Sequence, residues 1–226
     1  MKSRPLDKIL AIVALLLTPL FFISLSALIP CTVRVFYYAS IDPLDIPESS
    51  GYSREVIVGA YDDVMDFIWR GAEFKTGELA WTESEKEHFE DSMFLFHLQA
   101  VFASVAGALL VAYFLLIKFG VLRPWRPKGL SPIAWGGMLT LALLIALGIF
   151  ALVDFDQLFV VFHQVFFPGK SNWTFNPYTE EVINILPETF FAVCAGFIAG
   201  LAILLSICSI VVGFVCKRQR DKHATA

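Results

Sequence analysis

Four long apolar stretches separate the polar parts of this chain. They cover residues 9–29, 94–119, 132–153 and 189–216. An α-helix rises about 1.5 Å per residue, so roughly 20 apolar residues cross the hydrocarbon core of a bilayer. Each stretch has this length. The pattern therefore predicts an all-α membrane protein with four transmembrane helices.

Composition agrees with this interpretation. The chain is 57% hydrophobic and 17% charged, whereas soluble domains are roughly 45–50% apolar. The first stretch also resembles a signal peptide, because it has a basic start and an apolar core. Ile29 and Pro30 are not the small residues that a cleavage site needs, so an uncleaved first span is favoured. The four cysteines are interpreted as small apolar side chains and not as a disulfide framework.

Basic residues predict the orientation. Of the 17 Lys and Arg, 11 precede the first stretch, lie at the end of the second or between it and the third, or follow the fourth. Such residues favour the cytoplasmic side, which predicts that both termini are cytoplasmic. All acidic residues except Asp7 and Asp221 fall on the other two loops. The net charge of −4 is thus the sum of basic segments on the predicted inner side and acidic loops on the predicted outer side. This distribution argues against a nucleic-acid partner.

These patterns divide the chain into eight predicted segments. Four are membrane spans, one loop forms a small extracellular cap, a second extracellular loop is aromatic, and the tail is expected to be disordered. The segments are 1–29 (N-terminus and first span), 30–92 (cap loop), 93–119 (second span), 120–131 (cytoplasmic loop), 132–153 (third span), 154–188 (aromatic loop), 189–216 (fourth span) and 217–226 (cytoplasmic tail).

The cap loop contains signals for two helices. A first helix is predicted from Ser53, a suitable N-cap, to Gly71, a suitable terminator. Its apolar positions share one face at helical spacing: Ile57, Tyr61, Val64, Met65 and Ile68. A second helix begins at Thr82, where Thr82 and Glu85 form a capping-box pattern. This second helix is expected to run without a break into the second span.

Two histidines are the main candidates for chemistry. His88 precedes the second span and lies three residues before Asp91, so a helix places both on one face. The carboxylate there would hold one ring nitrogen and raise its basicity. His163 lies in the aromatic loop, where helical spacing gives it a side shared with Phe159, Phe166 and Phe167. The plainer alternatives are a solvated acidic helix surface for His88 and an interfacial aromatic belt for His163.

Motifs for other chemistry are missing from the sequence. There is no G-x-S-x-G elbow, no H-E-x-x-H, no C-x-x-C pair and no glycine-rich phosphate loop. Three alternatives stay open: a metal-dependent membrane hydrolase using His88, Asp91 and His163 as ligands, a transporter, and a pH sensor. Few polar or helix-breaking residues lie in the middle of the spans, which argues against a transporter.

The aromatic loop and its surroundings carry a family resemblance. Phe162-His163-x-x-Phe166-Phe167 is followed by Trp173, Phe175 and Pro177, then Glu180-x-Val182-Ile183 and Leu186-Pro187-Glu188-x-Phe190-Phe191. Together with Ser53-Arg54-Glu55 and Glu85-x-x-His88-x-x-Asp91, this pattern resembles the lipoprotein intramolecular transacylase family of bacterial membrane proteins. The resemblance covers nearly the whole chain.

The resemblance implies a function and a location. The enzyme would be a bacterial cell-membrane acyltransferase with its active site on the extracytoplasmic face. Its substrates would be diacylglyceryl-modified lipoproteins: the sn-2 acyl chain moves to the α-amino group of the N-terminal cysteine and leaves a lyso-form lipoprotein. His163 is expected to be the base and His88, held by Asp91, the acid, although the reverse assignment stays open. Neither a metal nor a cofactor is implied. The expected substrate-binding aromatics are Phe162, Phe166, Phe167, Trp173 and Phe175.

Overall fold

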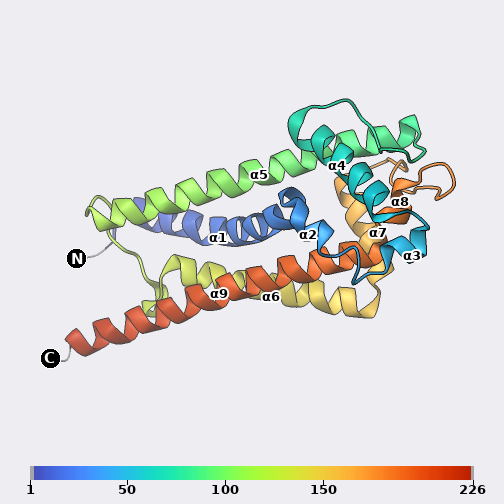
Figure 1. The fold of residues 1–226 in the computed structure, drawn as a ribbon. Helices are drawn as coiled ribbons and strands as arrows, with labels where there is room; N and C mark the ends of the chain where they lie inside the picture. Colours follow the sequence, from blue (N-terminus) through green and yellow to red (C-terminus); the bar gives the residue numbers. More distant parts are fainter. Residues whose placement is uncertain (1–2, 225–226) are drawn as a thin grey trace. The chain divides into compact units, whose positions relative to one another are not determined.

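The computed structural model describes residues 3–224, and within that range it contains helices and no strand (Figure 1). Four of these helices are long and apolar enough to cross a membrane. They are α1 (Pro5–Thr32), α5 (Glu83–Lys118), α6 (Pro132–Val153) and α9 (Glu188–Ala224). The predicted all-α class with four long apolar helices is thereby confirmed.

Shorter helices occupy the polar parts of the described chain. α2 (Arg34–Tyr38), α3 (Ile46–Ser50) and α4 (Arg54–Arg70) lie between α1 and α5. The 3-10 helix η1 (Pro127–Gly129) precedes α6, and α7 (Phe155–Phe166) and α8 (Val182–Ile185) lie between α6 and α9. The segment predicted as an aromatic loop is therefore partly helical.

The described chain forms two compact units. The first, here called the span unit, contains Met1–Ser26, Ala100–Ile149 and Phe197–Ala226, of which the structure describes residues 3–224. The second, here called the histidine unit, contains Ala27–Gln99 and Phe150–Gly196.

Small residues allow close helix packing in the span unit. A Cβ added to Gly136 of α6 would lie 2.4 Å from the Cβ of Thr18 on α1, and one added to Gly137 would lie 2.2 Å from Oγ of Ser209 on α9. Both contacts are too short for any side chain. Glycine at these positions lets α6 approach both neighbours, as is common among membrane helices.

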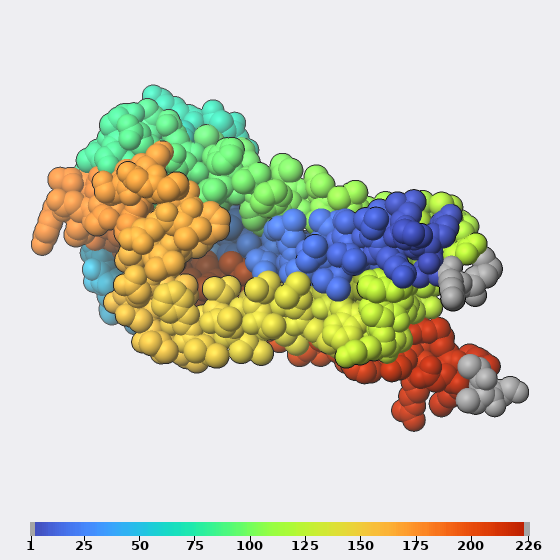
Figure 2. Space-filling view, turned by 180° about the vertical axis from the view of Figure 1, so that it is seen from behind, coloured from blue at the N-terminus to red at the C-terminus, as the bar shows by residue number. Residues whose placement is uncertain are grey.

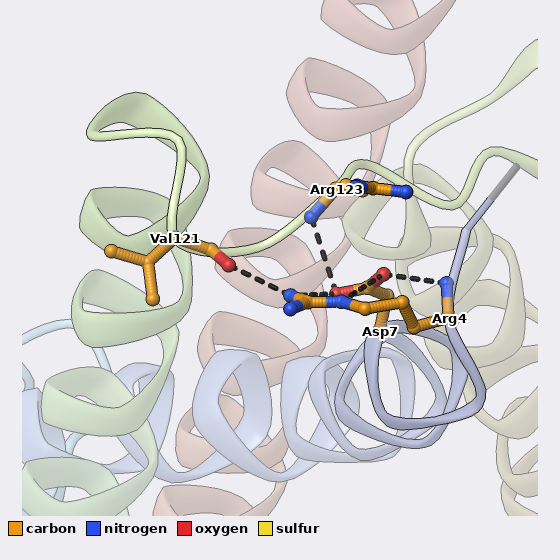
Figure 3. Close-up of polar contacts among 4 residues, drawn as sticks. All are labelled: Arg4, Asp7, Val121 and Arg123. Atoms are coloured by element: carbon orange, nitrogen blue, oxygen red, sulfur yellow. Dashed lines mark hydrogen bonds and ion pairs between the residues drawn. The ribbon is translucent and has the colours of Figure 1, made fainter. Parts of the chain in front are cut away.

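A buried carboxylate fixes the beginning of α1 within the span unit (Figure 3). Asp7 is 1% exposed and accepts hydrogen bonds from the backbone N–H of Arg4 at 2.6 Å and of Arg123 at 3.2 Å. The Arg4 guanidinium donates to Asp7 Oδ1 at 2.9 Å and to the Val121 carbonyl at 2.8 Å. The start of α1 is thus tied to the segment that follows α5.

The tail prediction was wrong where the structure describes it. Residues 217–224 continue α9 as a helix. Arg220 donates a hydrogen bond at 2.7 Å to the carbonyl of Gly129, the last residue of η1. Basic residues near a helix C-terminus also interact favourably with the helix dipole. The polar, charged composition of these residues suggested disorder, but it is equally compatible with the last turns of a helix.

The core of the histidine unit is built around α4 as its apolar spacing predicts. The five predicted core positions of α4 are all buried: Ile57, Tyr61, Val64, Met65 and Ile68. Ser53 caps the start, since its side chain accepts from the Val56 N–H at 3.4 Å, and Gly71 ends the helix at a φ of 68°.

The buried Tyr37 joins three elements of this core. Its ring stacks on Tyr61 of α4 with centroids 4.0 Å apart. Its hydroxyl donates to the carbonyl of Ile185 on α8 at 2.6 Å. α2, α4 and α8 therefore share one hydrogen-bonded and stacked contact that comes from widely separated parts of the sequence.

The predicted capping box at the start of α5 is only half formed. The Thr82 hydroxyl accepts from the backbone N–H of Glu85 at 3.3 Å, as the motif requires. The Glu85 carboxylate does not return the hydrogen bond, and both of its oxygens are buried without a partner. Thr82 instead donates its hydroxyl to Glu180 Oε1 at 2.7 Å.

Candidate active site

The histidine unit brings His88 and His163 together. His88 lies in the second turn of α5, and His163 lies near the end of α7. Their ring centroids are 5.9 Å apart, and the residues are 9% and 7% exposed, respectively. Figure 2 shows the two segments that carry them, the green start of α5 and the orange region around residues 160–180, lying against each other.

The start of α5 lies before the apolar part of that helix. α5 has 36 residues, which is roughly 54 Å at 1.5 Å per residue and exceeds a hydrocarbon core of about 30 Å. Charged residues are concentrated in the first nine positions: Glu83, Glu85, Lys86, Glu87, Glu90 and Asp91. His88 is among them and lies before the apolar part of the helix, which begins near residue 94.

His163 has a fixed tautomer. Its Nδ1 lies 2.8 Å from the carbonyl oxygen of Phe159, one turn earlier on α7. A carbonyl only accepts, so Nδ1 carries the proton and Nε2 of the neutral ring has a free lone pair. Burial lowers the pKa of His163, although the hydrogen bond to Phe159 partly opposes this effect. The ring is therefore a neutral base near neutral pH.

Aromatic rings enclose the imidazole of His163. Trp173 stacks on it with centroids 4.7 Å apart and an interplanar angle of 27°. Phe159 lies at 4.2 Å and Phe167 at 5.6 Å. These contacts restrict ring rotation and exclude water, so the position of Nε2 is well defined.

His88 has one unsatisfied ring nitrogen. Its Nδ1 is buried and has no hydrogen-bond partner in the described structure, while Nε2 lies 3.5 Å from Ser92 Oγ. Phe167 and Phe175 meet the ring edge-on with centroids at 4.9 and 5.4 Å. Burial, followed by the nearby His163, lowers the pKa of His88 to about 4. His88 is therefore also neutral near pH 7.

The hydrogen bond predicted between His88 and Asp91 is not formed. The Asp91 carboxylate instead accepts from Lys170 Nζ, with both oxygens at 2.5 Å, and from Asn172 Nδ2 at 3.4 Å. Burial alone would raise the pKa of Asp91, but the hydrogen bonds and charge of Lys170 outweigh it and lower the pKa. Helical spacing placed Asp91 on the correct face but could not reveal a partner 79 residues away.

The five predicted substrate-binding aromatics divide into two groups. Phe167, Trp173 and Phe175 surround the histidine rings. Phe162 touches His163 edge-on at 5.4 Å but is 47% exposed. Phe166 is 49% exposed and packs on Phe162, so the shared side predicted for His163 and Phe166 is not seen as a ring contact.

Two buried carboxyl groups near the site were not predicted as functional. Glu180 accepts from the Thr82 hydroxyl and from the backbone N–H of Asn176, each at 2.7 Å. Glu85 is 0% exposed, and burial together with the charge of Glu180 raises its pKa to about 8. Both residues stand in the family pattern quoted above, but Glu85 was interpreted there only as a capping residue and Glu180 was given no role.

The arrangement has the parts needed for acid–base chemistry. One ring offers a lone pair at Nε2, and its neighbour is a neutral imidazole that carries a proton on one of its nitrogens. Among the described residues, no group of three or more His, Cys, Asp or Glu side chains is placed to hold a metal ion. His88, Asp91 and His163 therefore do not form the ligand set required by the alternative hydrolase.

Comparisons with known proteins identify the fold and the family. The chain is similar to the membrane-integral lipoprotein intramolecular transacylase Lit from Bacillus cereus, with 21% identity, a TM-score of 0.83, and coverage of 96% of this chain and 98% of that one. A variant of the same Bacillus cereus protein with histidine replaced by arginine gives a TM-score of 0.77 at 21% identity, covering 96% and 95% of the two chains.

Sequence comparison extends over much of the chain. An uncharacterized protein of Aquifex aeolicus (strain VF5) is 30% identical over 152 residues, which are 66% of this chain and 64%, less than two thirds, of that protein. The family model for the lipoprotein intramolecular transacylase Lit matches residues 12–191. The chain therefore belongs to the lipoprotein intramolecular transacylase family of integral membrane proteins.

Proposed function

We propose that this protein moves the sn-2 acyl chain of an S-diacylglyceryl group onto the α-amino group of the same lipoprotein's N-terminal cysteine. The product is an N-acyl, S-monoacylglyceryl lipoprotein. The observation that carries the proposal is the enclosed pair of neutral imidazoles, one of which keeps Nε2 free as a base. Membership in the transacylase family supports the substrate class.

The proposed orientation places this chemistry on the outer membrane face. Both termini would be cytoplasmic, and residues 30–92 and 154–188 would form an extracytoplasmic cap. The distribution of Lys and Arg supports this topology, because 11 of 17 lie on the proposed inner side. Lipoprotein substrates carry their lipid-modified cysteine at the outer surface of the same bilayer, which is where the histidines would then lie.

His163 would act as the general base. The substrate amine has a reference pKa of about 7.7–8.0, and its neutral form attacks the sn-2 ester carbonyl. A C–N bond forms and the carbonyl oxygen becomes an oxyanion. Nε2 of His163 then takes a proton from the attacking nitrogen. A base positioned in this way typically contributes about 10²–10⁴-fold to the rate.

His88 would act on the oxygen side of the reaction. Its ring N–H donates first to the tetrahedral oxyanion and then transfers the proton to the departing sn-2 oxygen as the C–O bond breaks. The glycerol oxygen leaves as a hydroxyl group. Transfer of the proton on His163 back to His88 restores both neutral rings, so the overall reaction neither consumes nor releases a proton once the amine is neutral.

The enclosing aromatics would reduce the entropic cost of the reaction. Both reacting groups belong to one substrate molecule, but they lie on flexible arms that must close a large ring. Well-oriented intramolecular reactions gain up to about 7–11 kcal/mol in this way. Trp173, Phe167 and Phe175 are the side chains nearest the two imidazoles on the loop side, so they would confine the glyceryl arm.

Purified His88→Ala and His163→Ala proteins test this function with a synthetic diacylated lipopeptide. Substrate and product are isomers of equal mass, so tandem mass spectrometry must locate the acyl chain on the amine. Each variant should lose at least about 100-fold in rate, while His223→Ala, on an exposed residue near the end of α9, should retain full activity. Wild-type rates in either site variant would refute the mechanism, and release of free fatty acid would indicate a hydrolase.

A further inference from the structure

The Asp91 carboxylate binds a primary ammonium group beside the histidine pair. Lys170 Nζ lies 2.5 Å from both carboxylate oxygens, and Asn172 contributes a third, longer hydrogen bond at 3.4 Å. The Asp91 side chain is 25% exposed and that of Lys170 is 49% exposed. The acceptor is therefore mostly enclosed, whereas the donor reaches it from the solvent side.

This carboxylate has a fixed position relative to His88. Both residues lie on α5 at a spacing of three, so their side chains share one face of a rigid element. Lys170, in contrast, follows Gly169, whose φ of 76° lies in the left-handed region that favours glycine. The helix thus provides a permanent acceptor, while the ammonium reaches it from a loop turn.

The same loop turn covers His163. Trp173 stacks on the His163 ring and donates from its indole N–H to the carbonyl of Lys170 at 3.0 Å. Lys170 and the ring that encloses the base therefore belong to one hydrogen-bonded turn. The Lys170 backbone is thus anchored beside the base, while its ammonium reaches Asp91 through a flexible side chain.

The proposed substrate carries the same chemical group as Lys170. Its N-terminal cysteine has a primary amine that is mostly protonated near neutral pH, since the reference pKa is about 7.7–8.0. A carboxylate that already binds one primary ammonium through both oxygens can bind another in the same way. No second acidic side chain is seen in contact with Lys170 among the described residues.

We propose that Asp91 is the binding site for the α-ammonium group of the substrate's N-terminal cysteine, and that Lys170 occupies this site until the substrate displaces it. The proposal rests on the proposed acyl transfer and assigns Asp91 to recognition instead of the orientation of His88.

The charges around Asp91 indicate which kinetic constant its substitution should change. Charged or titratable groups around Asp91 are His88 on its own helix and Lys170 on the loop, with the neutral amide of Asn172 beside them. A carboxylate stabilises the charged form of an amine, so it aids capture and not the loss of the proton. The effect of Asp91 is therefore expected mainly in KM and in binding, whereas removal of His163 lowers kcat.

Two substitutions on opposite sides of this ion pair provide the test. Asp91→Asn removes the acceptor charge and should raise KM for the diacylated lipopeptide by about 10- to 100-fold, as expected for a charge-assisted hydrogen bond. Lys170→Ala removes the competitor and should lower KM by about two- to five-fold, the range of a partly exposed ion pair. A merely structural ion pair predicts changes in the same direction for both variants, and that result would overturn the proposal.

Direct binding measurements make the test independent of turnover. Titration of purified protein with the free-amine lipopeptide and with its N-acetylated form should show that wild type prefers the free amine and that Asp91→Asn does not. Equal preference in both proteins would refute the ammonium site even if acyl transfer occurs. Conversely, an Asp91-dependent preference without lyso-form product would refute the proposed function and retain the site.

Matched controls separate the local effect from changes in surface charge. Glu90→Gln removes an exposed carboxylate next to Asp91 on the same helix, and Lys75→Ala removes a lysine paired with Glu73. Both should leave KM unchanged. Thermal melting of every variant shows whether it is folded, and Asp91→Glu should regain part of the free-amine preference because it retains the negative charge.

Discussion

Glu85→Gln should remove a pH dependence from the stability of the histidine unit. Glu85 is 0% exposed, and its carboxylate oxygens have no hydrogen-bond partner in the described structure. Burial and the neighbouring Glu180 raise its pKa from 4.5 to about 8. A raised pKa of an acid means that the folded protein binds a proton which the unfolded chain releases. Wild type should therefore lose stability as the pH rises from about 4.5 to about 8.

The size of this loss follows from linkage. Each pKa unit corresponds to about 1.4 kcal/mol, so the difference between 4.5 and about 8 corresponds to at most about 5 kcal/mol at high pH. Glutamine has nearly the same shape and cannot ionise. The free-energy advantage of the variant should thus be small at pH 5 and grow to a few kcal/mol at pH 9, or roughly 5–15 °C in Tm for a chain of this length.

Thermal melting in detergent at several pH values between 5 and 9 measures this effect. Glu87→Gln is the matched control, because Glu87 is exposed two residues further along the same helix. The difference in Tm between Glu85→Gln and wild type should widen with pH, while that of Glu87→Gln should not. Parallel curves for Glu85→Gln and wild type would show that Glu85 is not held neutral by its surroundings.

Two further predictions concern the histidines and the helix packing. NMR titration of ring nitrogens should show that His88 and His163 both protonate below pH 6.5, since burial lowers both pKa values; an apparent pKa above 6.5 for either ring would contradict the enclosed site. Gly136→Ala should destabilise the span unit by about 1–3 kcal/mol through overpacking, because the new methyl group would lie 2.4 Å from Thr18. Gly148→Ala on the same helix has open space and should not lower the Tm; equal losses in the two variants would refute the packing argument.

Local sequence signals predicted the helices well. The apolar stretches found all four long helices, and α6 has the predicted bounds of 132–153. Ser53 and Gly71 marked the ends of α4 because an N-cap hydroxyl and a left-handed glycine act over only a few residues. Such signals need no knowledge of the tertiary structure.

The candidate site was only partly accessible from the sequence. Both histidines were found, since ionisable groups next to apolar segments are unusual. The partner of Asp91 and the surroundings of Glu85 were not, because each depends on a residue that lies far away in the sequence. Asp91 would pair with His88 on an isolated helix, but Lys170 offers a charged donor. Glu85 would complete a capping box, but its buried carboxylate does not accept from the Thr82 backbone, while the Thr82 hydroxyl also binds Glu180.

The hydrogen bonds between the start of α5 and the segment before α9 have a consequence for biogenesis. Thr82 binds Glu180, and the backbone N–H of Ala80 donates to Glu181, across 98 and 101 residues of sequence. The ribosome must therefore synthesise the chain beyond residue 181 before these contacts can form. A nascent protein with three inserted helices would lack the enclosed histidine pair. The enclosed pair would then be completed only late in synthesis, after the third long helix and the segment that follows it have been made.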